Sequence, residues 1–165
     1  PVLCHTMEEV WQKFKTDNLE SVHLKAFKSP DNIWNNVNLS VKWENIKKII
    51  KIINTAIEIA RNEKKLGSSL EANVVLVTKD KSILEIINGI EMHNVCIISS
   101  FVVLDNKDKI ENNFISTFSN KEKNLEVFVY NTTFEKCLRC WQYKKEVSTN
   151  KGLCDRCLLV INKSK

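Results

Sequence analysis

Apolar residues recur at spacings of three and four between Val41 and Lys65, which is the pattern of one face of an α-helix. Ser40 is a suitable N-cap for this helix, and Gly67 follows its last turn as a C-cap would. At 1.5 Å per residue the helix would be about 37 Å long, which suits either a brace between domains or the core of a bundle. The apolar positions are Ile46, Ile49, Ile50, Ile53, Ile57 and Ala60.

After Gly67 the helical period ends, and short apolar segments bounded by polar residues predict β-strands; only 124–132 alternates strictly, with Leu125, Val127 and Val129 on one face. A helix opened by Asp80 is predicted over 80–90, and the polar stretch 105–124 predicts a loop or an irregular hairpin. The middle of the chain is therefore expected to be a small α+β unit. Strands are predicted over 72–78, 94–105 and 124–132.

The first 36 residues carry weaker patterns. A short helix is predicted over 6–15, with Thr6 and Glu9 as a capping box. The segment 21–27 reads as extended, and 28–36 reads as a loop. The chain has no initiating methionine and opens at the edge of a helix, so we expect it to be a piece of a longer protein.

Composition places the chain among soluble globular proteins. It has 165 residues, of which 43% are hydrophobic, and only three glycines and two prolines. The first residues do not resemble a secretory signal, and the longest apolar stretch, 95–104, is too short to span a bilayer as a helix. We therefore expect a cytoplasmic protein without membrane contact, in which paired cysteines are metal ligands rather than disulfides. Cys4 and Cys96 stand alone in apolar surroundings and are expected to be buried, inert thiols.

The other four cysteines form two C-x-x-C pairs separated by 13 residues, in the stretch "CLRCWQYKKEVSTNKGLCDRC". Two such turns can present four thiolates to one tetrahedral ion, so the spacing predicts one structural zinc ion. Four cysteines would close the coordination sphere, which argues against a catalytic zinc. A redox-active dithiol is the alternative for this spacing. The predicted ligands are Cys137, Cys140, Cys154 and Cys157.

The charge of the chain is concentrated in the same segment. Residues 137–165 contain seven basic and two acidic residues, which equals the net charge of +5 of the whole chain. The cations could merely offset the two negative charges of a zinc ion with four thiolates, or the excess could bind phosphate. Trp141 and Tyr143 offer faces on which unpaired bases could stack, although a tryptophan could instead cap a small core.

The quoted cysteine segment resembles the zinc finger at the C-terminus of bacterial-type isoleucyl-tRNA synthetases, with its C-x-R-C-W and L-C-x-R-C halves. The segment "RNEKKLGSSLEANVVL" (61–76) is similar to the junction of those enzymes, where a long helix passes into a small α+β region. The opening "PVLCHTMEEVW" resembles the end of their helical anticodon-binding domain, and "SVHL" follows in the expected order. The resemblance covers essentially the whole chain.

The resemblance implies an α+β chain with a helical N-terminal part that contains one long helix (1–66), a small α+β junction domain (67–132) and a four-cysteine zinc module (133–165). The parent enzyme would activate isoleucine with ATP and Mg²⁺ and would charge tRNA-Ile. This chain lacks the catalytic signatures of that reaction, so we expect it to have no catalytic residues and to be inactive alone. Its partner would be the anticodon end of tRNA-Ile. We expect the protein to be a monomer and not to bind DNA.

The resemblance also assigns roles to residues of the zinc module. The four cysteines of the two pairs would hold the zinc ion, and Trp141 would lie against bases of the anticodon loop; Tyr143 is added to the expected tRNA contacts for its aromatic face alone. For the two lysines the assignment depends on charge more than on the motif. Residues expected to contact phosphate are Arg139, Arg156, Lys144 and Lys145.

Other classes of protein share parts of this pattern. A stand-alone zinc-ribbon RNA-binding protein, or a zinc module that binds only protein, would carry the same cysteines. The same finger type closes formamidopyrimidine-type DNA glycosylases, whose nucleophile is an N-terminal proline followed by glutamate. Here Val2 follows Pro1 and the chain is shorter than those enzymes, so we reject that resemblance.

Overall fold

The computed structural model describes residues 2–14, 18–27 and 29–163, and it divides the chain into two compact units, Pro1–Val37 and Asn38–Lys165. Each unit is considered by itself below. Within the described residues, none of the helices is both long enough and apolar enough to cross a membrane.

In the described residues of the first unit, the chain forms the α-helix α1 (Cys4–Phe14) and short turns. Because α1 begins at Cys4, Thr6 lies inside the helix and the predicted capping box is wrong. Cys4 is exposed, so the expectation of a buried thiol is wrong as well. Residue 15, the predicted end of this helix, lies outside the described residues.

The segment expected to be extended contains a 3-10 turn, Val22–Leu24, instead. Its geometry is set by Glu8, whose carboxylate accepts hydrogen bonds from the Ser21 hydroxyl at 2.8 Å and from the Val22 N–H at 3.0 Å. A second 3-10 turn, Asn32–Trp34, lies within the predicted loop and is capped by Asp31. These turns are fixed by contacts that an alternation pattern does not encode.

The long helix α2 (Val37–Asn62) is present, but both of its predicted ends are displaced. It begins before Ser40, which is therefore not its N-cap. At the other end Lys64 adopts the left-handed conformation, with φ of 57°, and Lys65 N–H donates to the Ala60 carbonyl at 2.9 Å. The left-handed residue of this Schellman ending, Lys64, lies three residues before Gly67, so Gly67 is not the C-cap.

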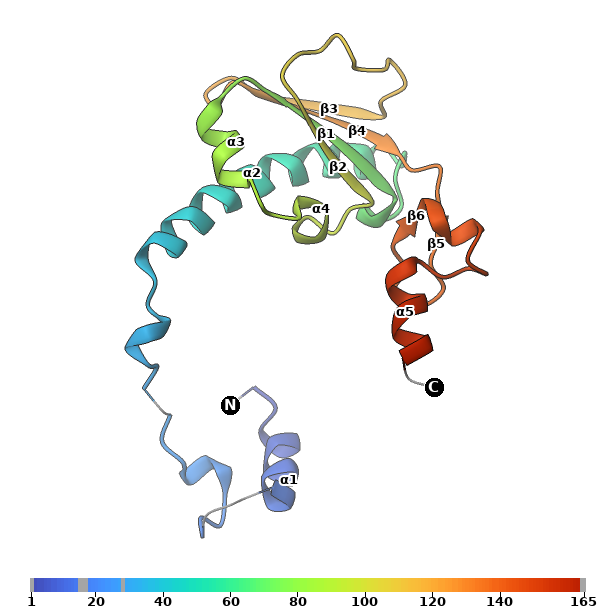
Figure 1. The fold of residues 1–165 in the computed structure, drawn as a ribbon. Coiled ribbons are helices and arrows are strands. Elements are labelled where there is room, and N and C mark those ends of the chain that lie inside the picture. Colours follow the sequence, from blue (N-terminus) through green and yellow to red (C-terminus); the bar gives the residue numbers. More distant parts are fainter. Residues whose placement is uncertain (1, 15–17, 28, 164–165) are drawn as a thin grey trace. The chain divides into compact units, whose positions relative to one another are not determined.

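The α+β region is built on a mixed four-stranded sheet in the order β2-β1-β4-β3 (Figure 1). Strand β1 pairs in parallel with β2 and antiparallel with β4, and β3 forms an antiparallel edge on β4. Two short helices, α3 and α4, connect β1 to β2. The bounds are β1 (Ala72–Thr78), α3 (Lys81–Ile87), α4 (Met92–Val95), β2 (Ser100–Leu104), β3 (Ser116–Asn120) and β4 (Leu125–Asn131).

The predicted strands at 72–78 and 124–132 are confirmed, and the α+β class with them. Asp80 caps α3 as predicted, through its carboxylate and the Ser82 N–H at 2.8 Å, although the helix ends at Ile87. The segment 94–105 is only half strand, because its first residues finish α4. The polar stretch before β4 contains β3 and therefore includes one strand of a hairpin.

Helix α2 packs on one face of the sheet, as Figure 1 shows, and the two together enclose the main core. The register places Val74 opposite Val129 and Leu76 opposite Val127, and all four side chains are fully buried. Burial of so many branched side chains is the dominant stabilising term of this unit. The helix contributes Ile46, Ile49, Ile52, Ile53, Ala56, Ile57 and Ala60 to this core.

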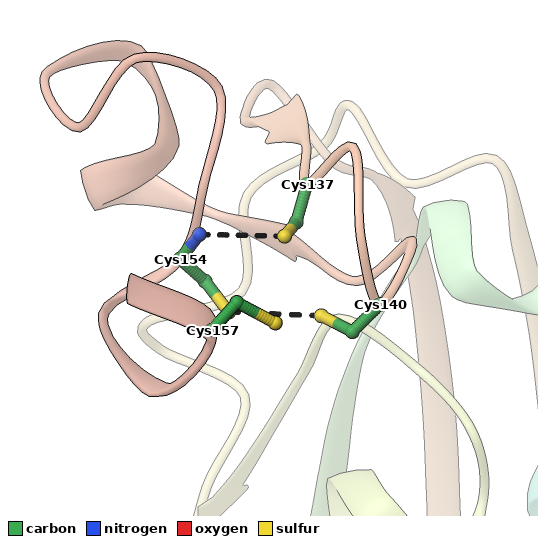
Figure 2. A group of neighbouring side chains, drawn as sticks. All are labelled: Cys137, Cys140, Cys154 and Cys157. Atoms are coloured by element: carbon green, nitrogen blue, oxygen red, sulfur yellow. Dashed lines mark hydrogen bonds between the residues drawn. The ribbon is translucent and has the colours of Figure 1, made fainter. Parts of the chain in front are cut away.

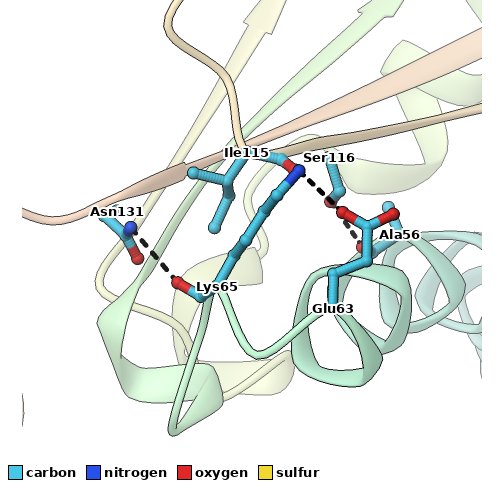
Figure 3. A network of polar contacts seen from close by, with 6 residues as sticks. All are labelled: Ala56, Glu63, Lys65, Ile115, Ser116 and Asn131. Carbon is cyan, nitrogen blue, oxygen red and sulfur yellow. Dashed lines mark hydrogen bonds and ion pairs between the residues drawn. The ribbon is translucent and has the colours of Figure 1, made fainter.

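Polar contacts tie the end of α2 to the edge of the sheet (Figure 3). The buried Ser116 hydroxyl donates to the Ala56 carbonyl at 2.6 Å. The Lys65 ammonium donates to the Ile115 carbonyl at 3.2 Å, and the Asn131 amide donates to the Lys65 carbonyl at 3.3 Å. The short edge strand β3 is therefore held to the helix as well as to β4.

Candidate metal centre

The first cysteine pair lies in a hairpin between β5 (Glu135–Lys136) and β6 (Tyr143–Lys144), which pair antiparallel. Inside the hairpin, Cys137 N–H donates to the Gln142 carbonyl and the Cys137 carbonyl accepts from Trp141 N–H, each at 2.9 Å. These two bonds close the turn around the C-x-x-C sequence. Both sulfur atoms of the pair therefore belong to one tight loop.

The second pair lies at the start of α5 (Asp155–Lys163). Cys154 directly precedes this helix and Cys157 occupies its first turn. The two pairs are joined where Leu138 N–H donates to the Gly152 carbonyl at 2.9 Å. Gly152 has a φ of 82°, a left-handed conformation that favours glycine over residues with a Cβ.

The four sulfur atoms converge, as Figure 2 shows, and all lie within 4.8 Å of one another. Cys140 and Cys154 Sγ are 3.6 Å apart, and Cys154 N–H donates to Cys137 Sγ at 3.4 Å. Three of the thiols are buried and that of Cys140 is half-buried. Four sulfurs at this separation are the donor set of a closed, tetrahedral, structural zinc site.

The protonation of the thiols supports a cation at this position. Burial by itself would raise the pKa of Cys137, but backbone N–H groups of Cys140, Cys154 and Arg139 outweigh it and lower this pKa to about 6. Burial and the neighbouring thiols raise the pKa of Cys154 to about 12. Burial would also raise the pKa of Cys157, but hydrogen bonds from Arg139 and from neighbouring thiols lower it. The cluster thus favours thiolate at Cys137 and Cys157 and resists it at Cys154, because several anions cannot share a buried site without a positive charge.

Both arginines of the knuckles are directed at sulfur. Arg139 Nη1 donates to Cys157 Sγ at 3.7 Å, and a hydrogen bond to the Cys140 sulfur raises the pKa of Arg156. Both side chains remain exposed. At least part of the positive charge predicted to meet phosphate therefore offsets the charge of the metal site.

Trp141 is presented outward. Its backbone is left-handed, with φ of 66°, and 61% of its surface is exposed, so the ring does not cap the buried core of the module. That core consists of Val147 and the cysteines, with Leu153 against it. The Lys136 ammonium lies 5.1 Å from the indole centroid in a cation–π contact. Sequence analysis missed Lys136, although it immediately precedes the first cysteine.

The remaining expected RNA contacts divide into two groups. Tyr143 and Lys144 are half-buried and directed at the α+β region: the Tyr143 hydroxyl lies 3.5 Å from a Glu71 carboxylate oxygen, and the Lys144 ammonium lies 3.5 Å from the Ser99 carbonyl. Lys145 is exposed. The structure thus gathers all six candidates in one module but turns two of them inward.

Comparison with known proteins agrees with this architecture. Residues 1–76 match the anticodon-binding domain of tRNA ligase, and residues 134–160 match the zinc finger found in FPG and IleRS. Isoleucine–tRNA ligase of Zymomonas mobilis is 34% identical over 161 residues, which cover 98% of this chain and 15% of the ligase. The Caldanaerobacter subterraneus ligase is 36% identical over 165 residues, which cover 95% of this chain and 17% of the ligase.

Similar coverage is found in a cyanobacterial relative. Isoleucine–tRNA ligase of Nostoc sp. is 32% identical over an alignment of 172 residues, gaps included, that covers 96% of this chain and 18% of the ligase. The chain thus spans less than a fifth of the length of the relatives it matches. With an anticodon-binding segment, an α+β region and a structural zinc finger in the same order, the chain belongs to the isoleucine–tRNA ligase family and corresponds to the C-terminal region of its members.

Proposed function

We propose that this chain is the tRNA-recognition region of an isoleucine–tRNA ligase and grips the anticodon end of tRNA-Ile. The observation that carries the proposal is an exposed, cation-flanked tryptophan on a zinc-finger module that holds the excess charge of the chain. The parent would be a cytoplasmic, monomeric enzyme that activates isoleucine with ATP and Mg²⁺ in parts outside this chain. This chain alone would not aminoacylate tRNA.

The metal site has a structural role in this proposal. Cys137, Cys140, Cys154 and Cys157 are the ligands of one zinc ion, which cross-links the hairpin of β5 and β6 to α5. The module is too small to bury a core without this cross-link. Arg139 and Arg156 stabilise the thiolates by facing them, while their exposed edges remain accessible to phosphate.

The proposed RNA-binding surface consists of the side chains of the module that are exposed to solvent. Trp141 stacks on an unpaired base, and two exposed cations of the same module, Lys136 beside the indole ring and Lys145, bind phosphate. Tyr143 and Lys144 serve mainly to hold the module against the α+β region.

The division into parts 1–66, 67–132 and 133–165 stays a prediction about the functional segments of the chain.

The test is a binding titration of tRNA-Ile with the whole chain and its Trp141→Ala variant. Loss of one stacked base should weaken binding by about five- to a hundredfold, while zinc content stays at one per chain. Trp141→Phe keeps an aromatic face and should retain most of the affinity. Leu159→Ala is the matched control, because Leu159 is also 61% exposed on the same module.

Salt supplies the second readout of the same titration. Phosphate contacts release counterions, so the affinity should fall steeply as salt is added. An affinity that does not change with salt, or a Trp141→Ala variant that binds like the Leu159→Ala control, would contradict the proposed surface.

A further inference from the structure

Three consecutive residues of the zinc module contact the α+β region. The Gln142 amide donates to the Asn94 side-chain oxygen at 3.2 Å. The next two residues, Tyr143 and Lys144, make the longer contacts to Glu71 and Ser99 described above. Strand β6 therefore faces the sheet domain, whereas Trp141, directly before this run, faces solvent.

The Glu71 carboxylate is held in place by contacts within its own segment, independently of the zinc module. One oxygen accepts the Gly67 N–H at 3.1 Å, and Ser68 caps the 3-10 turn Ser69–Glu71. A Cβ at Gly67 would lie 3.2 Å from this oxygen, so the close approach favours glycine. Buried Leu66 anchors the same segment in the core. The other Glu71 oxygen is the one that lies near Tyr143.

Ser99 is the second contact point, and it is 3% exposed. Its hydroxyl proton is shared between the Leu70 carbonyl at 2.8 Å and the Tyr143 carbonyl at 3.3 Å. Its backbone N–H donates to the Ala72 carbonyl at 2.9 Å, where β1 begins. One buried serine thus joins the sheet, the 66–71 segment and the zinc module.

A strained turn delivers Ser99 to this position. Helix α4 ends in a Schellman motif in which Ile98 N–H donates to the His93 carbonyl at 2.9 Å and Ile97 is left-handed, with φ of 55°. A β-branched residue is unfavourable in that conformation. The turn nevertheless places Ile98 in the core and Ser99 beneath β6.

We propose that the segment 66–71 and Ser99 form a docking seat that fixes the orientation of the zinc module on the α+β region. This inference depends on the proposed function, because the orientation of the module affects binding only if one RNA molecule contacts both the module and the rest of the chain. It also gives a role to the "KLGSSLEA" sequence, which contributes none of the four converging cysteines. Glu71 and Ser99 are positioning residues that act through Tyr143.

The alternative to a seat is a module tethered by its linker alone. Strand β4 ends at Asn131 and β5 begins at Glu135, so only residues 132–134 connect the two parts. A tethered module would sample many orientations, and ordering them on binding would cost affinity. A seated module avoids this cost.

The test compares the orientation of the module with that of the sheet in the whole, zinc-loaded chain. Residual dipolar couplings of backbone amides should fit one alignment tensor across both parts in the wild type. Ser99→Ala and Tyr143→Phe should each require a second tensor for 135–163, with zinc still at one per chain. Ser100→Ala is the matched control, since its hydroxyl bonds Asn73 within the sheet at 2.9 Å.

Binding of tRNA-Ile is then measured on the same samples. Loosening the seat should weaken binding by about three- to tenfold. Two tensors in the wild type, or a single tensor retained in both seat variants, would overturn the seat whatever the RNA does. Looser variants with unchanged affinity would overturn its positioning role. A wild-type chain that binds no tRNA contradicts the proposed function, while the couplings still decide whether the seat exists.

Discussion

At the scale of single residues, the chain places large side chains where glycine is usual. Ile97 and Trp141 both have positive φ, and both side chains are more than half exposed. The left-handed conformation costs a residue with a Cβ about 1–2 kcal/mol. Trp141 gains an outward position for its ring from this conformation. The exposed Ile97 side chain gains no comparable burial, so its strain is offset only by the contacts of its neighbours.

Replacing Ile97 with glycine should therefore stabilise the chain. The backbone strain is relieved while little buried surface is lost, so we expect the free energy of unfolding to rise by about 1 kcal/mol. Denaturant unfolding measures this value. Lys64→Gly is the matched control at the corresponding position of α2, and its smaller gain would reflect an unbranched side chain. A destabilised Ile97→Gly variant would show that the isoleucine side chain contributes more than its exposure indicates.

At the scale of elements, helix α2 holds the sheet through a narrow row of isoleucines. Ile53 is completely buried in the core, and the adjacent Asn54 is exposed. Ile53→Ala should lower the free energy of unfolding by about 2–5 kcal/mol, because it removes buried methyl groups and leaves a cavity. Asn54→Ala should change it by less than about 0.5 kcal/mol. Similar losses in the two variants would contradict the packing of α2.

The elements that sequence predicted best are those whose own residues determine them. Strand β1 was predicted to the residue, since its apolar run at 74–77 is flanked by polar residues, Asn73 and Thr78. The ends of α2 were not, because good capping residues at Ser40 and Gly67 were outcompeted by a helix that starts earlier and a turn at Lys64. Strand β3 lies in the stretch predicted as a loop or an irregular hairpin, and its bounds could not be predicted because Phe118 is its only apolar residue.

The metal site could be predicted from local sequence, whereas the docking seat could not. Two C-x-x-C turns specify convergent sulfurs from local spacing, so the convergence of the four cysteines could be predicted from sequence. The seat brings together Glu71, Ser99 and Tyr143, which are up to 72 residues apart in the chain. No local pattern marks these three residues, and only the fold shows that Tyr143 is directed inward while Trp141 is directed outward.

At the scale of the whole molecule, the excess positive charge and the large apolar core lie in different parts of the chain. The excess positive charge lies in residues 137–165, and the rest of the chain is balanced. The large apolar core lies in the α2 and sheet region, whereas the core of the module consists almost entirely of its own cysteines. The part that carries the charge thus depends on metal for its fold, and the part that supports it does not.

Removal of zinc should therefore unfold one part of the described chain and spare another. A strong chelator should abolish the dispersed amide signals of 135–163, because binding energy on the order of 10 kcal/mol is lost and Val147 is the one residue other than cysteine buried in that core. Signals of β1 and β4 should keep their positions, since their core contains no metal ligand. Readdition of zinc should restore the module.

Cysteine variants separate this effect from general damage by the chelator. Cys154→Ser should reproduce the chelated spectrum and lower zinc content below one per chain. Cys96→Ala is the matched control: Cys96 is also buried, but in the core beneath α2, and burial raises the pKa of its thiol to about 11. It should leave zinc content unchanged. Simultaneous loss of the sheet and the module on chelation would instead mean that the seat couples them into one cooperative unit, against the division of stability drawn here.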